Sequence, residues 1–358
     1  MEKFVAIVVV ILVFEGSTFA LTPSKGCDKT LPDQPYPGHH ADFHVDYDDK
    51  LHGIVNRFYI LGLPKGYDNT QPLPLIFNLH GWTETANGHI HYSPWAKLIK
   101  EEDFVLVLPQ GMDDDPSGHP SWNCSSSVGP KGPTCDLDRN TWGETQCYNS
   151  CPLCDPMTSC DWTSCHDDIG FLDFLIHRVS HQYCIDMDHI HLSGISNGGM
   201  FAYYVASQAT DALGLATINP VAASSLIGYG DPPATKLPLS IIDIHGKGDD
   251  TIPYDFDASY GHGPHHSLIS YDGFYYDDKE KLMERWAKAM DCDIEEQTYP
   301  TEFDGERHWR CFERLCPSGQ AFVRCTGSWN HDYGLPPHHY EVTAKVAYRF
   351  MMHHPRVR

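Results

Sequence analysis

The chain has 358 residues, of which 41% are hydrophobic and 12% aromatic. A chain this rich in aromatic residues can bury enough apolar surface to offset its loss of conformational entropy, so an intrinsically disordered protein is excluded. Acidic residues outnumber lysine and arginine by 48 to 25, which gives a formal net charge of −23 at pH 7. Because this charge repels phosphate backbones and anionic lipid headgroups, we expect no nucleic acid and no membrane surface as partners.

Residues 1–20 have the pattern of a secretory signal peptide. Lys3 precedes an unbroken apolar run from residue 4 to residue 14, and small residues lead to a cleavage-like end at Ala20. The run is too short to span a bilayer, so cleavage near Ala20 is favoured over an uncleaved anchor. The sequence therefore predicts a secreted, extracellular protein.

Thirteen cysteines occur in the chain, and seven of them lie between residues 124 and 165. In an exported protein such cysteines are expected to form disulfides, with at least one left over because thirteen is odd. Cys151 and Cys154 have the spacing of a redox or zinc pair, but no second pair at finger spacing accompanies them. We therefore predict a disulfide-stapled segment and no metal site.

Strand-like and helix-like stretches alternate after a polar, proline-rich N-terminal extension at residues 21–49. Short apolar runs bounded by proline or glycine predict buried strands at residues 54–61, 73–79, 104–108, 190–192 and 239–244. Apolar residues at helical spacing predict helices at 167–183, 197–209, 278–290 and 340–352. This alternation predicts an α/β fold with a mostly parallel sheet and helices on both faces, in one domain from residue 50 to residue 358.

Residues 112–166 interrupt this pattern, because they are rich in Cys, Pro, Ser, Gly and Asp and have no periodicity. Loops of this length are usually functional or disordered, and the seven cysteines argue against disorder. We expect a disulfide-stapled insertion at the edge of the sheet. Asn123-Cys124-Ser125 is a glycosylation sequon, which predicts a glycan on Asn123.

Gly194-Ile195-Ser196-Asn197-Gly198 directly follows a predicted strand and opens a predicted helix. Small residues on both sides of the serine permit the sharp turn of a nucleophile elbow, which exposes the serine Oγ beside the helix N-terminus. The alternative is a Gly-Ser turn that caps the helix. The context favours Ser196 as a catalytic nucleophile.

A serine nucleophile needs a base and an orienting acid, which follow it along the chain in this type of fold. Asp249 lies on the loop after the predicted strand 239–244, with Asp250 as its competitor. His331 precedes the last predicted helix, and its rivals His338 and His339 lie at the start of that helix. We expect Asp249 and His331 to complete the triad.

Leu79-His80-Gly81-Trp82-Thr83 follows the second predicted strand, where this fold places an oxyanion loop. The expected donors are the backbone N–H groups of Trp82 and Asn197, with Thr83 as the alternate. Near the site the sequence also offers residues for substrate contact, which are equally compatible with core or lid positions: Thr83, Trp122, Trp329 and Tyr333.

Together these motifs resemble the α/β-hydrolase family of secreted polyhydroxybutyrate depolymerases and feruloyl or acetylxylan esterases, the LpqC-like group. The matching segments, in family order, are residues 79–83, 108–111, 121–123, 167–172, 194–200, 245–249, 252–254 and His331. The resemblance implies an α/β-hydrolase fold, a serine carboxylic-ester hydrolase without a cofactor, and Asp249 rather than Asp250 as the acid.

The chain departs from the family around the site. The family has a short stretch where this chain carries its cysteine-rich insertion, often a small residue or cysteine where Trp82 stands, and a different pattern around His331. We therefore expect an ester substrate, polymeric or oligomeric, with feruloyl or acetyl esters of polysaccharide favoured. The alternatives are depolymerisation of polyhydroxybutyrate, a peptidase of similar fold, and a non-catalytic binding module on a hydrolase scaffold.

Overall fold

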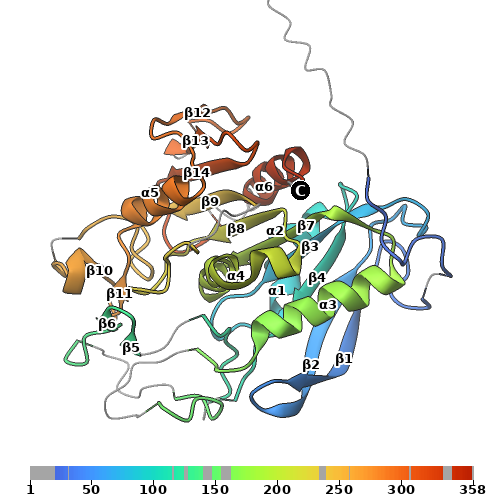
Figure 1. Cartoon of the computed structure of the whole chain (residues 1–358), viewed down its shortest axis with the longest axis horizontal. Helices are drawn as coiled ribbons and strands as arrows, with labels where there is room; N and C mark the ends of the chain where they lie inside the picture. Colours follow the sequence, from blue (N-terminus) through green and yellow to red (C-terminus); the bar gives the residue numbers. More distant parts are fainter. Residues whose placement is uncertain are drawn as a thin grey trace, which may run out of the picture.

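The computed structural model describes residues 21–30, 32–114, 117–124, 128–139, 147–154, 163–233, 239–257, 259–305, 308–333 and 341–356 (Figure 1). The expected signal peptide and the rival bases His338 and His339 lie outside these residues, as does Ser125 of the glycosylation sequon.

One twisted sheet organises the chain, and the described residues contribute ten strands to it. In spatial order these are β1 (His40–Asp49), β2 (Gly53–Gly62), β4 (Val105–Pro109), β3 (Leu73–Leu79), β7 (Ile185–Ile195), β8 (Thr217–Val221), β9 (Ser240–Gly246), β14 (Ala321–Gly327), β13 (Arg310–Leu315) and β12 (Gln297–Tyr299). From β4 to β14 neighbouring strands are parallel, whereas the pairs at both ends are antiparallel. The mostly parallel sheet is therefore confirmed.

Helices cover both faces of the sheet (Figure 1). On one side lie α3 (Asp168–Gln182), α4 (Asn197–Leu213) and α5 (Lys279–Ala289), and on the other α1 (Ala86–Tyr92), α2 (Pro94–Leu98) and α6 (Glu341–His353). Alternate residues of β3 enter opposite cores: Leu75 and Phe77 face the α3–α4 side, and Ile76 faces the α2–α6 side. A strand that is buried on both faces has a continuous apolar sequence without alternation, which is why residues 73–79 could be predicted as a strand.

The N-terminal extension contributes more to the sheet than its polar composition predicts. Residues 40–49 form β1, which pairs with β2 along its full length, so the sheet begins ten residues before the expected boundary at residue 50. Phe43, Val45 and Tyr47 alternate with polar residues, the pattern of a strand with one solvent-facing side. Cys27 is joined to Cys184, which ties the preceding segment to the start of β7.

Disulfides staple the cysteine-rich insertion, as the sequence predicts. Cys147 bonds Cys154 and Cys151 bonds Cys165, so the two members of the Cys-x-x-Cys motif have different partners. Two further bridges, Cys292–Cys316 and Cys311–Cys325, hold the strands at the β12 end of the sheet.

Short elements complete the described chain. The hairpins β5 (Val128–Gly129)–β6 (Gly132–Pro133) and β10 (Leu268–Ile269)–β11 (Tyr275–Tyr276) lie outside the main sheet, and a 3₁₀ turn, η1 (Pro264–His266), precedes β10. Within the described residues, no helix is long and apolar enough to cross a membrane.

Candidate active site

Ser196 lies in the tight turn between β7 and α4, with a positive φ of 56° that is uncommon for a residue with a side chain. The flanking glycines are required by close contacts. A Cβ on Gly194 would lie 2.4 Å from the Gly198 carbonyl oxygen, and a Cβ on Gly198 would lie 2.6 Å from the His80 carbonyl oxygen. This geometry is that of a nucleophile elbow.

Asp249 and His331 meet although 82 residues separate them, since His331 Nδ1 lies 2.8 Å from Asp249 Oδ2. Asp249 is buried on the loop after β9, and its competitor Asp250 is exposed. The other carboxylate oxygen, Oδ1, accepts hydrogen bonds from the backbone N–H groups of Thr251 and Ile252. With Nδ1 of His331 bonded to the acid, its Nε2 is left for the serine.

A second histidine binds the same carboxylate. His245 Nε2 lies 3.0 Å from Asp249 Oδ2 and 3.0 Å from the Ile252 carbonyl oxygen. Burial alone would raise the pKa of Asp249, but the hydrogen bonds from His245 and His331 outweigh it and hold the pKa well below its usual range. Asp249 is therefore ionised at any working pH. The contact joins residues four positions apart, at the end of β9 and in the loop after it, and the sequence pattern does not predict it.

Ser196 and His331 line one cavity of about 270 Å³. Of the other residues expected at the site, Trp82 and Tyr333 also line it. Thr83, Trp122 and Trp329 are not among the residues that line this cavity.

Trp122 and Trp329 support the site from inside the core. Trp122 is fully buried, stacks on Phe201, and donates from Nε1 to the His80 carbonyl oxygen at 3.0 Å. Trp329 is 5% exposed and stacks on Trp309. Of the two positions that the sequence left open for these rings, substrate contact or core, the structure shows the core.

The loop that is expected to supply an oxyanion donor runs from the end of β3 to α1. Asn197 is the first residue of α4, so its N–H has no intrahelical acceptor and points out of the helix N-terminus beside Ser196. Gly81 approaches the nucleophile closely, because a Cβ there would lie 3.4 Å from Ser196 Cβ. The alternate donor, Thr83 N–H, instead donates to the Pro120 carbonyl oxygen at 3.0 Å.

Buried His80 fixes this loop through both ring nitrogens. Nδ1 lies 2.7 Å from the Gly81 carbonyl oxygen, and Nε2 accepts from the Gly111 N–H at 2.9 Å. Burial lowers the pKa of His80 to about 4, so the ring is neutral and can donate from one nitrogen while it accepts at the other.

The cysteine-rich insertion braces the same loop. Tyr148 OH accepts a 2.9 Å hydrogen bond from Trp82 Nε1 and donates to the His119 carbonyl oxygen at 2.7 Å. Near the beginning of the insertion, the backbone N–H of Trp122 donates to the side-chain oxygen of Asn197 in α4 at 2.8 Å. The insertion therefore contacts both sides of the expected oxyanion hole.

Glu84 is a charged residue that also lines the cavity of Ser196 and His331, and the sequence does not point to it, because an acidic residue in a loop usually faces solvent. Its Oε2 accepts from the Gly81 N–H at 2.9 Å and lies 3.6 Å from His89 Nδ1. Burial would raise the pKa of Glu84, but interactions of the carboxylate with His89 and Tyr92 lower it to about 2. A fixed negative charge therefore lies in the cavity.

Asn123, the expected glycosylation site, is partly buried, and its Nδ2 donates to the His166 carbonyl oxygen at 2.8 Å. A glycan on this nitrogen would have to displace that bond. The glycan stays a prediction.

Asp49, His52 and His166 form a group with metal-ligand spacing in the described part of the chain, with one ligand atom of each within 4.8 Å of the others. Protein donors already occupy this carboxylate. Asp49 accepts from the N–H groups of Leu51, His52 and Asp167, and lies 3.0 Å from His166 Nδ1. The group therefore acts as a hydrogen-bonded clamp between the β1–β2 turn and the end of the insertion.

No family model matches the chain. Among curated proteins it is similar to a probable feruloyl esterase C of Aspergillus terreus, 24% identical over 244 residues that cover 66% of this chain and 66% of the relative. It is also similar to a bifunctional acetylxylan esterase/xylanase of Neocallimastix patriciarum, 23% identical over 181 residues that cover 51% of this chain and 20% of the relative. The chain thus spans between a fifth and two thirds of the length of these relatives.

Solved structures share the fold at low sequence identity. An acetyl xylan esterase from Aspergillus awamori is 11% identical with a TM-score of 0.53, over 87% of this chain and 99% of that one. The native structure of a protein named sOPH is 14% identical with a TM-score of 0.52, over 91% of each chain. The chain is therefore an α/β-hydrolase-fold protein, and its curated relatives confirm the resemblance to feruloyl and acetylxylan esterases that its motifs indicate.

Proposed function

We propose that the protein is a secreted serine carboxylic-ester hydrolase that works through an acyl-enzyme and needs no cofactor. The observation that carries the proposal is the 2.8 Å bond between His331 and Asp249, in a cavity that His331 shares with the elbow serine Ser196. A non-catalytic binding module on a hydrolase scaffold would not need an acid, a base and a serine placed together in this way.

In the proposed reaction His331 Nε2 takes the proton of Ser196 Oγ, which attacks the ester carbonyl carbon. The N–H groups of Trp82 and Asn197 stabilise the oxyanion, and Asp249 stabilises the imidazolium. His331 returns the proton to the leaving alcohol. Water, deprotonated by His331, then attacks the acyl carbon, so that the acid is released and Ser196 regains its proton.

As substrate we propose feruloyl or acetyl esters of polysaccharide. The curated relatives carry these activities in their names, and Trp82 and Tyr333 offer aromatic surface inside the cavity. Oligomers of polyhydroxybutyrate are the second candidate, which the resemblance of the motifs to polyhydroxybutyrate depolymerases implies.

The test compares hydrolysis of methyl ferulate, acetylated xylan and a hydroxybutyrate trimer by the wild type and by Ser196→Ala. The serine variant should lose turnover by about four orders of magnitude or more, since the residual rate of triad variants is that small. A serine-directed fluorophosphonate should label the wild type and not the variant. Near-wild-type turnover in Ser196→Ala would refute the mechanism, and absence of both labelling and turnover would favour a binding module.

A further inference from the structure

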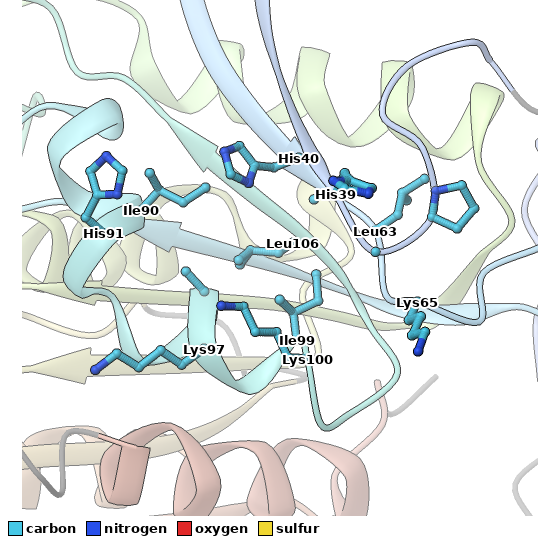
Figure 2. Close-up of a pocket in the computed structure, with 14 residues that line it drawn as sticks. His39, His40, Leu63, Lys65, Ile90, His91, Lys97, Ile99, Lys100 and Leu106 are labelled. Atoms are coloured by element: carbon cyan, nitrogen blue, oxygen red, sulfur yellow. The ribbon is translucent and has the colours of Figure 1, made fainter.

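A second cavity, of about 550 Å³, lies between the β1 end of the sheet and the helices α1 and α2 (Figure 2). It shares no lining residue with the catalytic cavity. The two cavities nevertheless lie beside the same short helix, because Ile90 and His91 of α1 line this one and Tyr92 lines the catalytic one.

The charges around this cavity are of one sign. Its titratable lining residues are all basic, and no acidic residue lines it: they are His39, His40, Lys65, His91, Lys97 and Lys100. Figure 2 shows these side chains spread around the cavity, with Lys97 and His91 on one side and Lys65 on the other. In a chain with a formal net charge of −23, a cavity whose titratable lining residues are all basic is unlike the average surface.

Two of the lysines carry charge that the protein does not neutralise. Within the described residues, neither Lys65 nor Lys100 has a carboxylate within ion-pair distance, and both side chains are exposed. Elsewhere on the described surface, lysines such as Lys131 and Lys345 each pair with two carboxylates. The charge at this cavity is therefore available to an anion.

The interior of the cavity is apolar. Leu63 and Leu106 are buried side chains of its wall, and Ile90 and Ile99 are half-buried. Figure 2 shows Leu106 and Ile99 at the centre, among the basic side chains. An apolar wall with a few charged groups around it, in a volume of several hundred Å³, is typical of a small-molecule site rather than of a protein interface.

We propose that this cavity binds a small organic carboxylate with an apolar body, through charge-assisted contacts from Lys65 and Lys100. Acids of this class are what hydrolysis of a feruloyl ester releases, so the choice of ferulate as the ligand rests on the proposed function. The site would then hold product beside the catalytic cavity, on the other flank of α1.

The experiment measures ferulate binding by titration calorimetry after a fluorophosphonate has occupied Ser196 and blocked the catalytic cavity. Ferulate should bind the blocked protein, and its uncharged methyl ester should bind at least about tenfold more weakly, because the ester lacks the anion. Equal binding of the two compounds, or no binding of ferulate, would overturn the proposal. Inorganic phosphate is the third titrant, and phosphate that binds as tightly as ferulate would refute the need for an organic acid.

The location of the site is tested with the double variant Lys65→Gln/Lys100→Gln, which should weaken ferulate binding about tenfold. The control is Lys25→Gln/Lys288→Gln, which makes the same change in charge at exposed lysines outside the cavity. Equal affinity of the two double variants would overturn the site. Both should keep the esterase activity of the wild type. If the fluorophosphonate labels nothing, the proposed function fails, but the comparison of the two double variants still tests the site, since it measures binding and not turnover.

Discussion

His245 illustrates how a buried residue without access to substrate can control a catalytic group. Its Nε2 faces two acceptors, Asp249 Oδ2 and the Ile252 carbonyl oxygen, while its Nδ1 has no hydrogen-bond partner among the described residues. The proton therefore belongs on Nε2, and the ring holds the carboxylate that orients His331. We infer that His245 is a positioning residue.

Replacement of His245 by phenylalanine should lower kcat by about tenfold, because a hydrogen bond to a charged group contributes about 1.5–3 kcal/mol. Loss of this donor disfavours the ionised carboxylate and raises the pKa of Asp249. The carboxylate then interacts more strongly with the protonated imidazole of the base, so the low-pH loss of kcat/KM should begin at a higher pH in the variant. The measurement is the pH profile of ester hydrolysis.

The matched control is His245→Gln, whose amide N–H can replace the imidazole donor and should restore much of the rate. A phenylalanine variant with reduced kcat and an unshifted pH profile would mean that His245 only fills space.

Glu84 should make the catalytic cavity selective by charge. Its carboxylate is ionised. A Cβ built on Gly81 would lie 3.3 Å from Glu84 Oε2 and 3.4 Å from Ser196 Cβ, so the carboxylate and the nucleophile lie on the same side of Gly81. A second negative charge on the acyl group, several ångströms away in a partly solvated cavity, is repelled by about 1–2 kcal/mol. The wild type should therefore prefer 4-nitrophenyl acetate to 4-nitrophenyl succinate.

Glu84→Gln should reduce this preference about tenfold in the ratio of the two kcat/KM values, since 1.4 kcal/mol corresponds to a factor of ten. The neutral ester serves as the internal control for damage to the oxyanion loop. An unchanged ratio would show that the charge of Glu84 acts on the loop alone, through the Gly81 N–H.

At the scale of elements, the cysteine-rich insertion acts as a brace for the catalytic loop. Tyr148 contributes its hydroxyl to Trp82, and two disulfides hold the segment around Tyr148. Tyr148→Phe leaves the partly buried indole N–H of Trp82 without this acceptor, at a cost of about 1–3 kcal/mol. If the loop supplies an oxyanion donor, kcat should fall about tenfold while KM changes little.

Steady-state kinetics on a soluble ester checks this, with Tyr36→Phe as a control at an exposed tyrosine. An increase of KM at constant kcat would contradict the brace and indicate that the insertion contacts substrate instead.

The elements that sequence reasoning identified are those with a strong local signal. All five expected strands and four expected helices are present, including the 73–79 strand and the helix that begins at Asn197. The missed strand β8 contains Pro220, which normally argues against a central strand. Strands β12 to β14 are specified by pairing and by the Cys311–Cys325 bridge rather than by their own composition.

The candidate site likewise contains residues that the sequence predicts and residues that it does not. Ser196, Asp249 and His331 follow from the order of motifs along the chain, and the structure brings the acid and the base together. Glu84 and the double contact of Asp249 depend on how distant segments meet. The local sequence gives no signal for such contacts.

At the scale of the whole molecule, a clamp joins the first hairpin to both ends of the insertion. His166 lies between Asp49, at 3.0 Å, and Asp114, at 3.8 Å, with the ring of His52 packed against it. Burial would lower the pKa of His166, but the hydrogen bonds to Asp114 and Asp49 outweigh it and raise the pKa. In both aspartates burial would raise the pKa, but the hydrogen bonds they accept, including those from His166, lower it.

These shifts give the clamp a pH window. The raised pKa of His166 adds stability that is complete below the ordinary histidine value of about 6.5 and is lost as the pH rises through the folded-state value. The lowered pKa values of Asp49 and Asp114 add stability above the ordinary aspartate value of about 3.9, and it is lost as the pH falls through their folded-state values. The clamp is therefore strongest between about pH 4 and pH 6.5.

His166→Gln should accordingly lower the melting temperature more at pH 5.5 than at pH 8.5, by about 2–4 °C for each kcal/mol of clamp energy lost. The wild type alone cannot test this, because other titratable groups of the chain also change its stability with pH. The difference between wild type and variant removes that common effect. Equal destabilisation by His166→Gln at both pH values would mean that the clamp operates with a neutral imidazole, as a hydrogen bond without an ion pair.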